Sequence, residues 1–269
     1  MIGEANSSVI RVESAIDPRL DDYRELRDPR ARRRIEGDEF FICEGPVALE
    51  RLLASDHRLR SVLVLERRLA ATRELLNGSN APILVVDAAT MHEVSGFDLH
   101  RGVIAAAERR PASTLERVVS SARRIIVLEG LNDPENLGAI ARSARAFGAD
   151  AMIVDATCID PYTRRSVRVS MGEILHLPWM RVDSIVDACA RLREFGVTTW
   201  ALTPAREAES LTLIDPPDRL ALLLGAEGPG LSAATLHAAD RCVRIPIAAD
   251  VDSLNVAAAA AVALSHLQP

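Results

Sequence analysis

The chain has 269 residues, which is enough for one large domain or two domains of moderate size. Its hydrophobic content of 48% and charged content of 26% are ordinary for a globular protein. The net charge is −6 and all 32 basic residues are arginine, which argues against a surface covered in nucleic-acid contacts but leaves room for a local basic patch.

Cysteine and histidine spacing indicates neither disulfides nor a metal site. The four cysteines are far apart in sequence and form no CxxC pair, so we expect reduced, buried thiols. The six histidines form no HxxxH or HExxH pair. The N-terminus lacks a signal-peptide pattern, and the longest apolar run, residues 256–264, is too short to span a bilayer. We therefore expect a cytoplasmic protein with no metal and no membrane anchor.

Residues 1–37 are polar and are predicted to form an arginine-rich N-terminal extension. Within eleven residues of it lie Arg24, Arg27, Arg30, Arg32, Arg33 and Arg34. Two interpretations remain open, namely a solvated helix face balanced by neighbouring acids and a contact with RNA phosphates. The charge pattern alone favours the solvated face.

Residues 38–107 alternate between apolar runs and helical periodicity, which predicts a small α/β domain. The expected strands cover residues 40–43, 61–66, 82–86 and 102–107, and the expected helices cover residues 45–53, 67–76 and 88–94. Residues 108–122 break this pattern with an Arg-Arg-Pro sequence and are predicted to form a linker.

Residues 123–269 resume the alternation and predict a second α/β domain. The expected strands cover residues 124–129, 151–154, 177–180, 197–202, 220–224 and 242–247. Helices are expected after residue 138, over residues 184–195 and from residue 256 almost to the end. Repeated strand–helix alternation predicts a mainly parallel sheet that is covered by helices on both faces.

Three polar or glycine-rich loops follow expected strands, at residues 132–142, 225–230 and 250–255. Two strand ends that are each followed by an irregular loop and a helix are typical of the ligand-binding edge of an α/β sheet. The GxxGxG pattern at 225–230 is not the dinucleotide fingerprint, and the absence of lysine excludes a P-loop. No histidine lies near these loops, so a Ser–His–Asp triad is not indicated.

Taken together and in this order, three motifs resemble the SPOUT superfamily, specifically its SpoU/TrmH-type branch of RNA 2′-O-ribose methyltransferases. The motifs are Asn136–Arg142 (NLGAIAR), Leu224–Leu231 (LGAEGPGL), and IPI at 245–247 with SLNV at 253–256. The resemblance covers about residues 124–267. Residues 38–107 are similar to the ribosomal-protein-like substrate-binding domain that often precedes this fold.

The resemblance implies a fold, a cofactor and partners. In this branch the C-terminal part of the sheet domain threads through a loop as a deep trefoil knot. The knot forms the pocket for S-adenosylmethionine, and the members act as homodimers with the active site at the subunit interface. No metal is implied. Because arginine clusters precede the small domain in relatives, the resemblance favours RNA contact by Arg30, Arg32, Arg33 and Arg34.

The resemblance also implies which side chains form the site. The implied catalytic residues are Asn136, Arg142, Glu227, Ser253 and Asn255. The implied cofactor-binding residues are Leu224, Gly225, Gly230, Ile245 and Leu254. An arginine remains protonated, so it is expected to polarise the ribose 2′-oxygen and grip a phosphate rather than act as a base. Ser253 and Asn255 are also suited to capping the last helix.

We therefore expect an S-adenosylmethionine-dependent methyltransferase that acts on a ribose 2′-hydroxyl. Ribosomal RNA is favoured as substrate, because two-domain relatives tend to act on it, and transfer RNA is the alternative. A non-catalytic RNA-binding or ribosome-assembly factor on the same fold is an alternative of another class. A nucleotide-dependent oxidoreductase is remote, because the loop at residues 130–138 has no GxGxxG.

Overall fold

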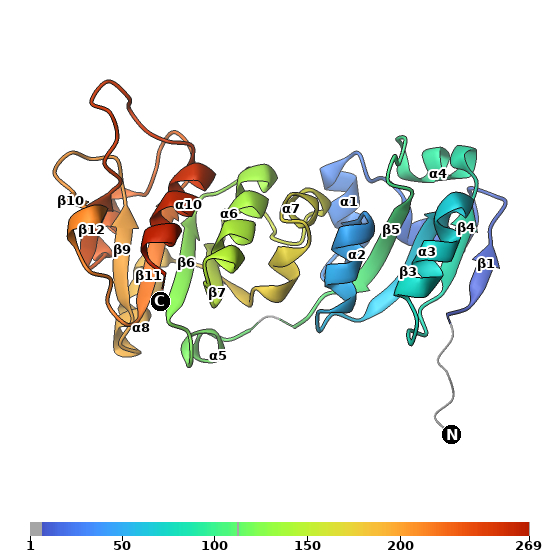
Figure 1. Ribbon diagram of the computed structural model, residues 1–269, viewed down its shortest axis with the longest axis horizontal. Helices are drawn as coiled ribbons and strands as arrows, with labels where there is room; N and C mark the ends of the chain where they lie inside the picture. Colours follow the sequence, from blue (N-terminus) through green and yellow to red (C-terminus); the bar gives the residue numbers. More distant parts are fainter. Residues whose placement is uncertain (1–6, 112, 269) are drawn as a thin grey trace. The chain divides into compact units, whose positions relative to one another are not determined.

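The computed structural model describes residues 7–111 and 113–268, and the chain divides into two compact units. Unit 1 contains the residues up to Arg110 together with Tyr162–Leu175. Unit 2 contains Pro111–Pro161 and the residues from His176 onward. Each unit is a sheet with helices packed against it, which confirms the predicted α/β fold class (Figure 1).

Unit 1 is built on a five-stranded sheet of order β1-β4-β3-β5-β2. The strands β1, β4 and β3 run parallel, and β5 runs antiparallel to both β3 and β2. Ile42, Leu63, Leu84 and Ile104 come from four adjacent strands and share one apolar core. The strands are β1 (Val9–Arg11), β2 (Phe40–Glu44), β3 (Leu59–Leu65), β4 (Ile83–Val86) and β5 (Val103–Glu108). The helices are η1 (Pro18–Tyr23), α1 (Pro29–Glu36), α2 (Pro46–Leu53), η2 (Glu66–Arg68), α3 (Leu69–Leu75), α4 (Ala88–Ser95) and α7 (Arg164–Val169).

The described residues before 38 belong to unit 1, so the prediction of a separate N-terminal extension is wrong. Strand β1 pairs in parallel with β4, and Leu20 and Tyr23 of η1 are fully buried. The Tyr23 hydroxyl lies 2.7 Å from the Ser61 hydroxyl of β3 in a buried hydrogen bond. A three-residue strand and a six-residue 3-10 helix are too short to produce a visible periodicity, so the polar composition dominated the prediction.

The predicted linker, residues 108–122, is likewise folded into both units. Glu108 is the last residue of β5. The short helix α5 (Leu115–Val119) buries Leu115, Val118 and Val119 in the core of unit 2. The boundary between the units falls between Arg110 and Pro111. A helix of five residues covers barely more than one turn, which is why helical periodicity did not reveal it.

Unit 2 is built on a seven-stranded parallel sheet of order β10-β12-β9-β11-β6-β7-β8. The strands are β6 (Arg124–Glu129), β7 (Ala151–Asp155), β8 (Trp179–Val182), β9 (Thr198–Leu202), β10 (Glu209–Ser210), β11 (Leu220–Gly225) and β12 (Arg241–Arg244). Besides α5, the helices are α6 (Pro134–Ala146), α8 (Ile185–Glu194), η4 (Leu211–Leu213), α9 (Ala233–Ala238) and α10 (Val256–His266), and η3 (Glu173–His176) lies at the boundary with unit 1.

Helices cover both faces of this sheet. On one face α6 and α10 lie side by side (Figure 1). On the other face α5 and α8 pack against alternate strand residues such as Ile125, Val127 and Leu223. Because all the strands are parallel, their carboxyl ends meet at one edge, which is where ligands bind in such sheets.

The loops at that edge differ from expectation in two respects. Helix α6 already begins at Pro134, after the cap Asp133, so most of residues 132–142, which were expected to form a loop, are helical. Strand β12 ends at Arg244, whereas the sequence predicted a strand through Ile247. Pro246 has no amide hydrogen and cannot continue the ladder of hydrogen bonds, so the strand ends before it. Ile245 and Ile247 are thereby placed in a loop that can line a cavity.

Arg124 fastens the end of α10 to the first strand of unit 2. Its buried guanidinium donates hydrogen bonds to the carbonyl oxygens of Leu267 at 2.6 Å, Asp218 at 2.8 Å and Pro217 at 3.1 Å. Burial lowers the pKa of Arg124, but these carbonyls satisfy the charge. The last helix is therefore held against the sheet at both ends, here and at the loop that precedes it.

The cysteines of the chain carry free thiols. Cys43, Cys158 and Cys189 are buried free thiols, and burial raises the pKa of Cys158 to about 12 and that of Cys189 to about 11. In the part of the chain that the structure describes, no helix has the length and apolarity needed to cross a bilayer. The same residues contain no group of three or more His, Cys, Asp or Glu that could hold a metal ion.

Candidate active site

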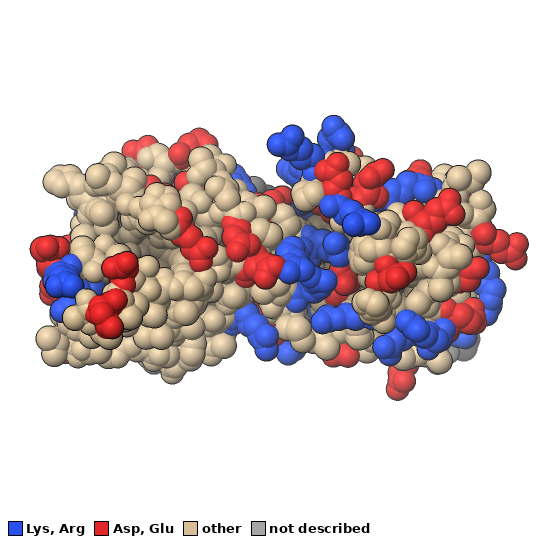
Figure 2. Space-filling model, turned by 90° about the horizontal axis from the view of Figure 1, so that it is seen from above, with Lys and Arg blue, Asp and Glu red and all other residues tan. Residues whose placement is uncertain are grey.

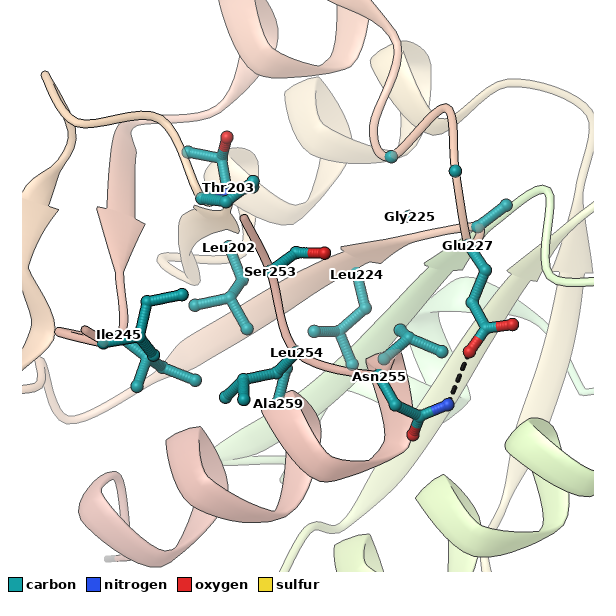
Figure 3. A pocket seen from close by; sticks show the side chains of 16 residues that line it. Leu202, Thr203, Leu224, Gly225, Glu227, Ile245, Ser253, Leu254, Asn255 and Ala259 are labelled. Atoms are coloured by element: carbon teal, nitrogen blue, oxygen red, sulfur yellow. Dashed lines mark hydrogen bonds between the residues drawn. The ribbon is translucent and has the colours of Figure 1, made fainter. Parts of the chain in front are cut away.

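Unit 2 has a cavity at the edge where β9, β11 and β12 end. These three strands are neighbours in the sheet and run parallel, so their last residues lie together. The cavity measures about 350 Å³, a size typical of a small-molecule site. Figure 3 shows the side chains that surround it. Eight predicted site residues line it: Leu224, Gly225, Glu227, Gly230, Ile245, Ser253, Leu254 and Asn255.

The loop after β11 turns back on its own strand end. A Cβ atom on Gly225 would lie 2.1 Å from the carbonyl carbon of Gly230 and 2.2 Å from the amide nitrogen of Leu231. The Gly230 amide donates to the Ala226 carbonyl at 3.0 Å and closes the turn. Gly228 and Gly230 have φ angles of 84° and 69°, in the left-handed region. Glycine at position 225 is therefore required by the loop itself, in addition to any ligand.

Glu129, at the end of the neighbouring strand β6, anchors the far end of this loop. Its carboxylate accepts hydrogen bonds from the Ser232 amide and hydroxyl, both at 2.8 Å, and from the Thr235 hydroxyl at 2.7 Å. These groups lie at the start of α9, where a carboxylate also interacts favourably with the helix dipole. The wall of the cavity at residues 225–231 is thus tied to the sheet at both ends.

Asn255 joins the loop before α10 to two other parts of the site. Its side-chain oxygen caps α10 by accepting from the Ala257 amide at 3.0 Å and the Ala258 amide at 3.2 Å. This fixes the orientation of the amide, so that its nitrogen faces Asn136 and Glu227. That nitrogen donates to Asn136 Oδ1 at 3.0 Å and to Glu227 Oε1 at 2.5 Å (Figure 3 shows the latter bond).

Asn136 reaches this cluster from the first turn of α6. The helix begins at Pro134 after the cap Asp133, which places Asn136 in a buried position with only 8% exposed. The loop before α6 is held by Asp155 of β7. Burial tends to raise the pKa of Asp155, but hydrogen bonds from Cys158, Thr157 and the Gly130 amide outweigh it and lower the pKa.

Arg142 lies outside the cavity. It is six residues after Asn136 on α6, which rotates its side chain by about 240° around the helix axis. Ile140, Ala141 and Ala144 form the buried face of this helix, and Arg142 is exposed. No hydrogen bond or ion pair joins Arg142 to a described residue of its own chain. The structure therefore brings Asn136, Glu227 and Asn255 together but leaves Arg142 apart from them.

Sequence reasoning missed the part of the cavity that comes from β9. Leu202, Thr203 and Pro204 line it at the end of that strand. The sequence does contain a signal for this part of the site. Strand β9 is followed by Thr-Pro, a turn-forming pair, just as β11 and β12 are followed by irregular loops. This turn alone does not place β9 at the site, because the order of strands in the sheet cannot be obtained from the sequence. The missed residues in other segments are Ala226, Gly228, Ile247, Val256 and Ala259.

The predicted RNA-binding arginines of α1 do not share one environment. Arg32 is 7% exposed and forms an ion pair with the buried Glu36 one turn later, at 2.7 Å. The prediction that Arg32 contacts RNA is therefore wrong, because its guanidinium is enclosed. Arg33 is exposed but pairs with Asp38 at 2.6 Å. Arg30 and Arg34 are exposed, so RNA contact by these two and Arg33 stays a prediction.

Comparisons with known proteins agree with the geometry of unit 2. Residues 123–265 match the model of the SpoU rRNA Methylase family. The chain is 43% identical over 252 residues to an uncharacterized tRNA/rRNA methyltransferase of Mycobacterium tuberculosis, with 92% of this chain and 87% of that protein covered. It is 32% identical over 203 residues to a 23S rRNA (guanosine-2′-O-)-methyltransferase of a Burkholderia species, with 74% of this chain and 82% of that protein covered.

A solved structure is similar over nearly the whole chain. The crystal structure of an S-adenosylmethionine-bound rRNA methyltransferase from Sinorhizobium meliloti matches with a TM-score of 0.79 and 25% sequence identity. The match covers 96% of this chain and 97% of that one. The similarity therefore extends over both units and not only over the sheet that carries the cavity.

Proposed function

The chain belongs to the SpoU rRNA methylase family, and from this premise we propose that it methylates a ribose 2′-hydroxyl in ribosomal RNA. It is an S-adenosylmethionine-dependent RNA methyltransferase. The Burkholderia relative, a 23S rRNA (guanosine-2′-O-)-methyltransferase by name, supports the ribose and the ribosomal RNA. Transfer RNA is the second candidate, because the name of the M. tuberculosis relative includes it.

The cavity fits S-adenosylmethionine in size and in chemistry. Leu202, Leu224 and Ile245 offer an apolar wall for a flat base (Figure 3), and Gly228 and Gly230 of the lining have open space beside their main chain. When bound, the cofactor supplies a methyl group on a positively charged sulfur, so that the leaving group is neutral. The chain has to bind and orient the two reactants and to assist removal of the hydroxyl proton.

The observation that carries the proposal is the hydrogen-bonded cluster of Asn136, Glu227 and Asn255 at the cavity. Asn255 holds Glu227 Oε1, which leaves Glu227 Oε2 to accept a hydrogen bond from a ribose hydroxyl. Asn136 holds Asn255 from the other side, so the position of the carboxylate depends on three elements at once. Ser253, two residues before the cap, lies at the cavity and is proposed to orient the substrate.

Arg142 is proposed to polarise the 2′-oxygen and to grip a neighbouring phosphate. A guanidinium stays charged at neutral pH, so it favours the alkoxide-like oxygen without accepting the proton. Because Arg142 is exposed and lies outside the cavity of its own chain, we propose that it acts in a homodimer with the active site at the subunit interface. The deep trefoil knot implied by the motifs is proposed for the segment from β11 to α10.

A methyl-transfer assay tests this function. Purified protein, S-adenosylmethionine with a labelled methyl group, and unmodified 23S ribosomal RNA or bulk transfer RNA are incubated, and the digested RNA is analysed by mass spectrometry. We expect a 2′-O-methylnucleoside in the ribosomal RNA. Label on a base would contradict the ribose assignment, and label in transfer RNA alone would establish the second candidate.

Arg142→Ala tests the proposed role of the arginine. We expect kcat to fall by about 100-fold or more, since the charge that favours the attacking oxygen is lost, while the calorimetric affinity for S-adenosylmethionine changes less than about threefold. The matched control is Arg145→Ala, one helical turn further along α6 and also exposed. Equal activity of the wild type and Arg142→Ala would remove Arg142 from the mechanism.

A further inference from the structure

Charge is divided unevenly between the two units. Of the 32 arginines, 20 belong to unit 1 and 12 to unit 2, whereas the 38 carboxylate side chains divide 20 to 18. Unit 1 is therefore formally neutral, and unit 2 carries the whole net charge of −6. A polyanion such as RNA is therefore repelled less by unit 1 than by unit 2. Because unit 1 as a whole is neutral, a basic site on it requires arginines that have no carboxylate partner.

Four exposed arginines lie together on unit 1 and form no ion pair with a carboxylate of the described residues. We call them the arginine edge: Arg27, Arg67, Arg68 and Arg101. They gather at the end of the sheet where the parallel strands β3 and β4 finish and the antiparallel strand β5 begins. In Figure 1 this end carries the loop between α4 and β5, and Figure 2 looks onto it from above, where arginines and carboxylates are interspersed over unit 1.

The arginine edge is held together by main-chain contacts rather than by acids. Arg67 donates to the carbonyl oxygen of His100 at 3.3 Å, and Arg68 donates through Nε to that of Arg101 at 3.1 Å. Arg27 donates to the Gly96 carbonyl at 3.2 Å. Each of these guanidiniums keeps further N–H groups for a ligand, and each is partly oriented before the ligand arrives.

Glycines allow the arginine side chains to approach the main chain here. A Cβ atom on Gly45 would lie 2.9 Å from Cδ and 3.0 Å from Nη1 of Arg101. A Cβ atom on Gly102 would lie 3.1 Å from Cγ of Arg68 and 3.7 Å from Nε of Arg67. These distances show that Arg67, Arg68 and Arg101 converge on one patch of main chain.

Three carboxylates next to this edge in sequence or in the same loop have other partners. Glu66, next to Arg67, pairs with Arg11 at 2.8 Å. Asp98, in the same loop as Arg101, lies 2.8 Å from the His92 ring. Glu44, next to Gly45, is buried and pairs with Arg164 and Arg168. Among the residues that the structure describes, no carboxylate forms an ion pair with an arginine of the edge, whereas Arg32 and Arg33 of α1 are both paired.

We propose that the arginine edge binds the phosphate backbone of the RNA substrate. The proposal rests on the proposed function, because it assumes that the chain methylates RNA. Planar guanidiniums with free N–H groups match phosphate oxygens in pairs, and closely spaced guanidiniums suit successive phosphates of one strand. Such contacts set affinity and register without reading the bases, so the arginine edge is a recognition surface and not a catalytic one.

A charge-matched pair of variants of the full-length protein tests this site. One variant carries Arg67→Gln, Arg68→Gln and Arg101→Gln. The control carries Arg58→Gln, Arg73→Gln and Arg110→Gln, which remove the same charge from exposed arginines elsewhere on unit 1. Binding of unmodified 23S ribosomal RNA is measured at several salt concentrations, together with calorimetric binding of S-adenosylmethionine and with KM and kcat for the RNA.

We expect the edge variant to bind RNA at least about tenfold more weakly. The slope of the logarithm of the binding constant against the logarithm of the salt concentration should become shallower by the amount that about three phosphate contacts contribute. KM for RNA should rise while cofactor affinity and kcat stay near the wild type. The control should stay within about twofold of wild-type RNA affinity. Wild-type RNA affinity in the edge variant, or equal losses in both variants, overturns the arginine edge as the site. Absence of RNA binding by the wild type overturns the proposed function and this inference together.

Discussion

At the scale of single residues, Asn255 has the most constrained environment in the candidate site. Its oxygen caps α10, and its nitrogen donates to both Asn136 and Glu227. Any replacement therefore changes either the stability of the helix or the position of the carboxylate. Aspartate and alanine separate these two contributions, because aspartate keeps the capping oxygen and alanine does not.

Asn255→Asp is expected to keep the cap of α10, because aspartate is an equally good cap, so any loss in the free energy of unfolding comes from the contacts with Asn136 and Glu227. It replaces two donors by a carboxylate facing Glu227, so methyl transfer should fall about tenfold or more. Asn255→Ala should lose about 1 kcal/mol of stability as well as activity. Urea unfolding and the methyl-transfer assay measure the two quantities. A fully active Asn255→Asp enzyme would show that the donated hydrogen bonds do not position Glu227.

At the scale of elements, the loop after β11 shows how a strand end becomes a binding wall. Gly225 ends the strand, and the turn closed between Ala226 and Gly230 packs directly onto it. Gly228, by contrast, has open space around the position of a Cβ atom, although its φ angle of 84° disfavours other residues. Two glycines in one loop are thus required for different reasons, namely close approach of the chain and backbone conformation.

Gly225→Ala should displace residues 226–231 and weaken S-adenosylmethionine binding by about tenfold or more, since the added methyl overlaps the Gly230 carbonyl. The control Gly196→Ala, at a φ angle of 70° and outside the cavity lining, should cost about 1 kcal/mol of stability through its backbone conformation, with cofactor affinity within about threefold of wild type. Calorimetric titration of both variants measures this. Equal affinity of Gly225→Ala and the wild type would mean that the loop geometry does not define the pocket.

At the scale of the whole molecule, the chain leaves unit 2 after β7 and contributes Tyr162–Leu175 to unit 1. Tyr162 stacks on Phe41 of β2 with ring centroids 4.8 Å apart. Arg164 and Arg168 of α7 neutralise Glu44, whose side chain is only 6% exposed. Unit 1 is therefore completed by a segment that lies far along the sequence, and its stability depends on that segment.

The double variant Arg164→Gln, Arg168→Gln is expected to destabilise unit 1 by about 3 kcal/mol, because Glu44 remains buried without a cation. Adding Glu44→Gln should recover most of the loss, since the buried charge is then gone. Chemical denaturation measures the free energies, and hydrogen exchange of β2 amides assigns the change to unit 1. Failure of Glu44→Gln to restore stability would mean that packing of α7, and not charge, holds the segment.

Local patterns in the sequence determined most of the secondary structure, the family and much of the cavity lining. Apolar runs and helical spacing placed most strands and helices of both units, and three loops with their motifs indicated the family that the comparisons confirm. Eight predicted residues line the cavity, and Asn136 contacts one of them. These features depend on residues near one another in sequence, which is where periodicity and turn chemistry act.

Tertiary structure alone decided which distant residues meet at the site and which arginines are paired, because both depend on contacts between segments that are far apart in sequence. The order of strands brought Thr203 of β9 to the cavity, and helix packing enclosed Arg32 against Glu36 while leaving Arg142 exposed. Whether an arginine is free for a phosphate depends on which carboxylate lies beside it after folding. No local pattern records that pairing, so the arginine edge becomes visible only when strand ends and loops that are separate in sequence are placed side by side.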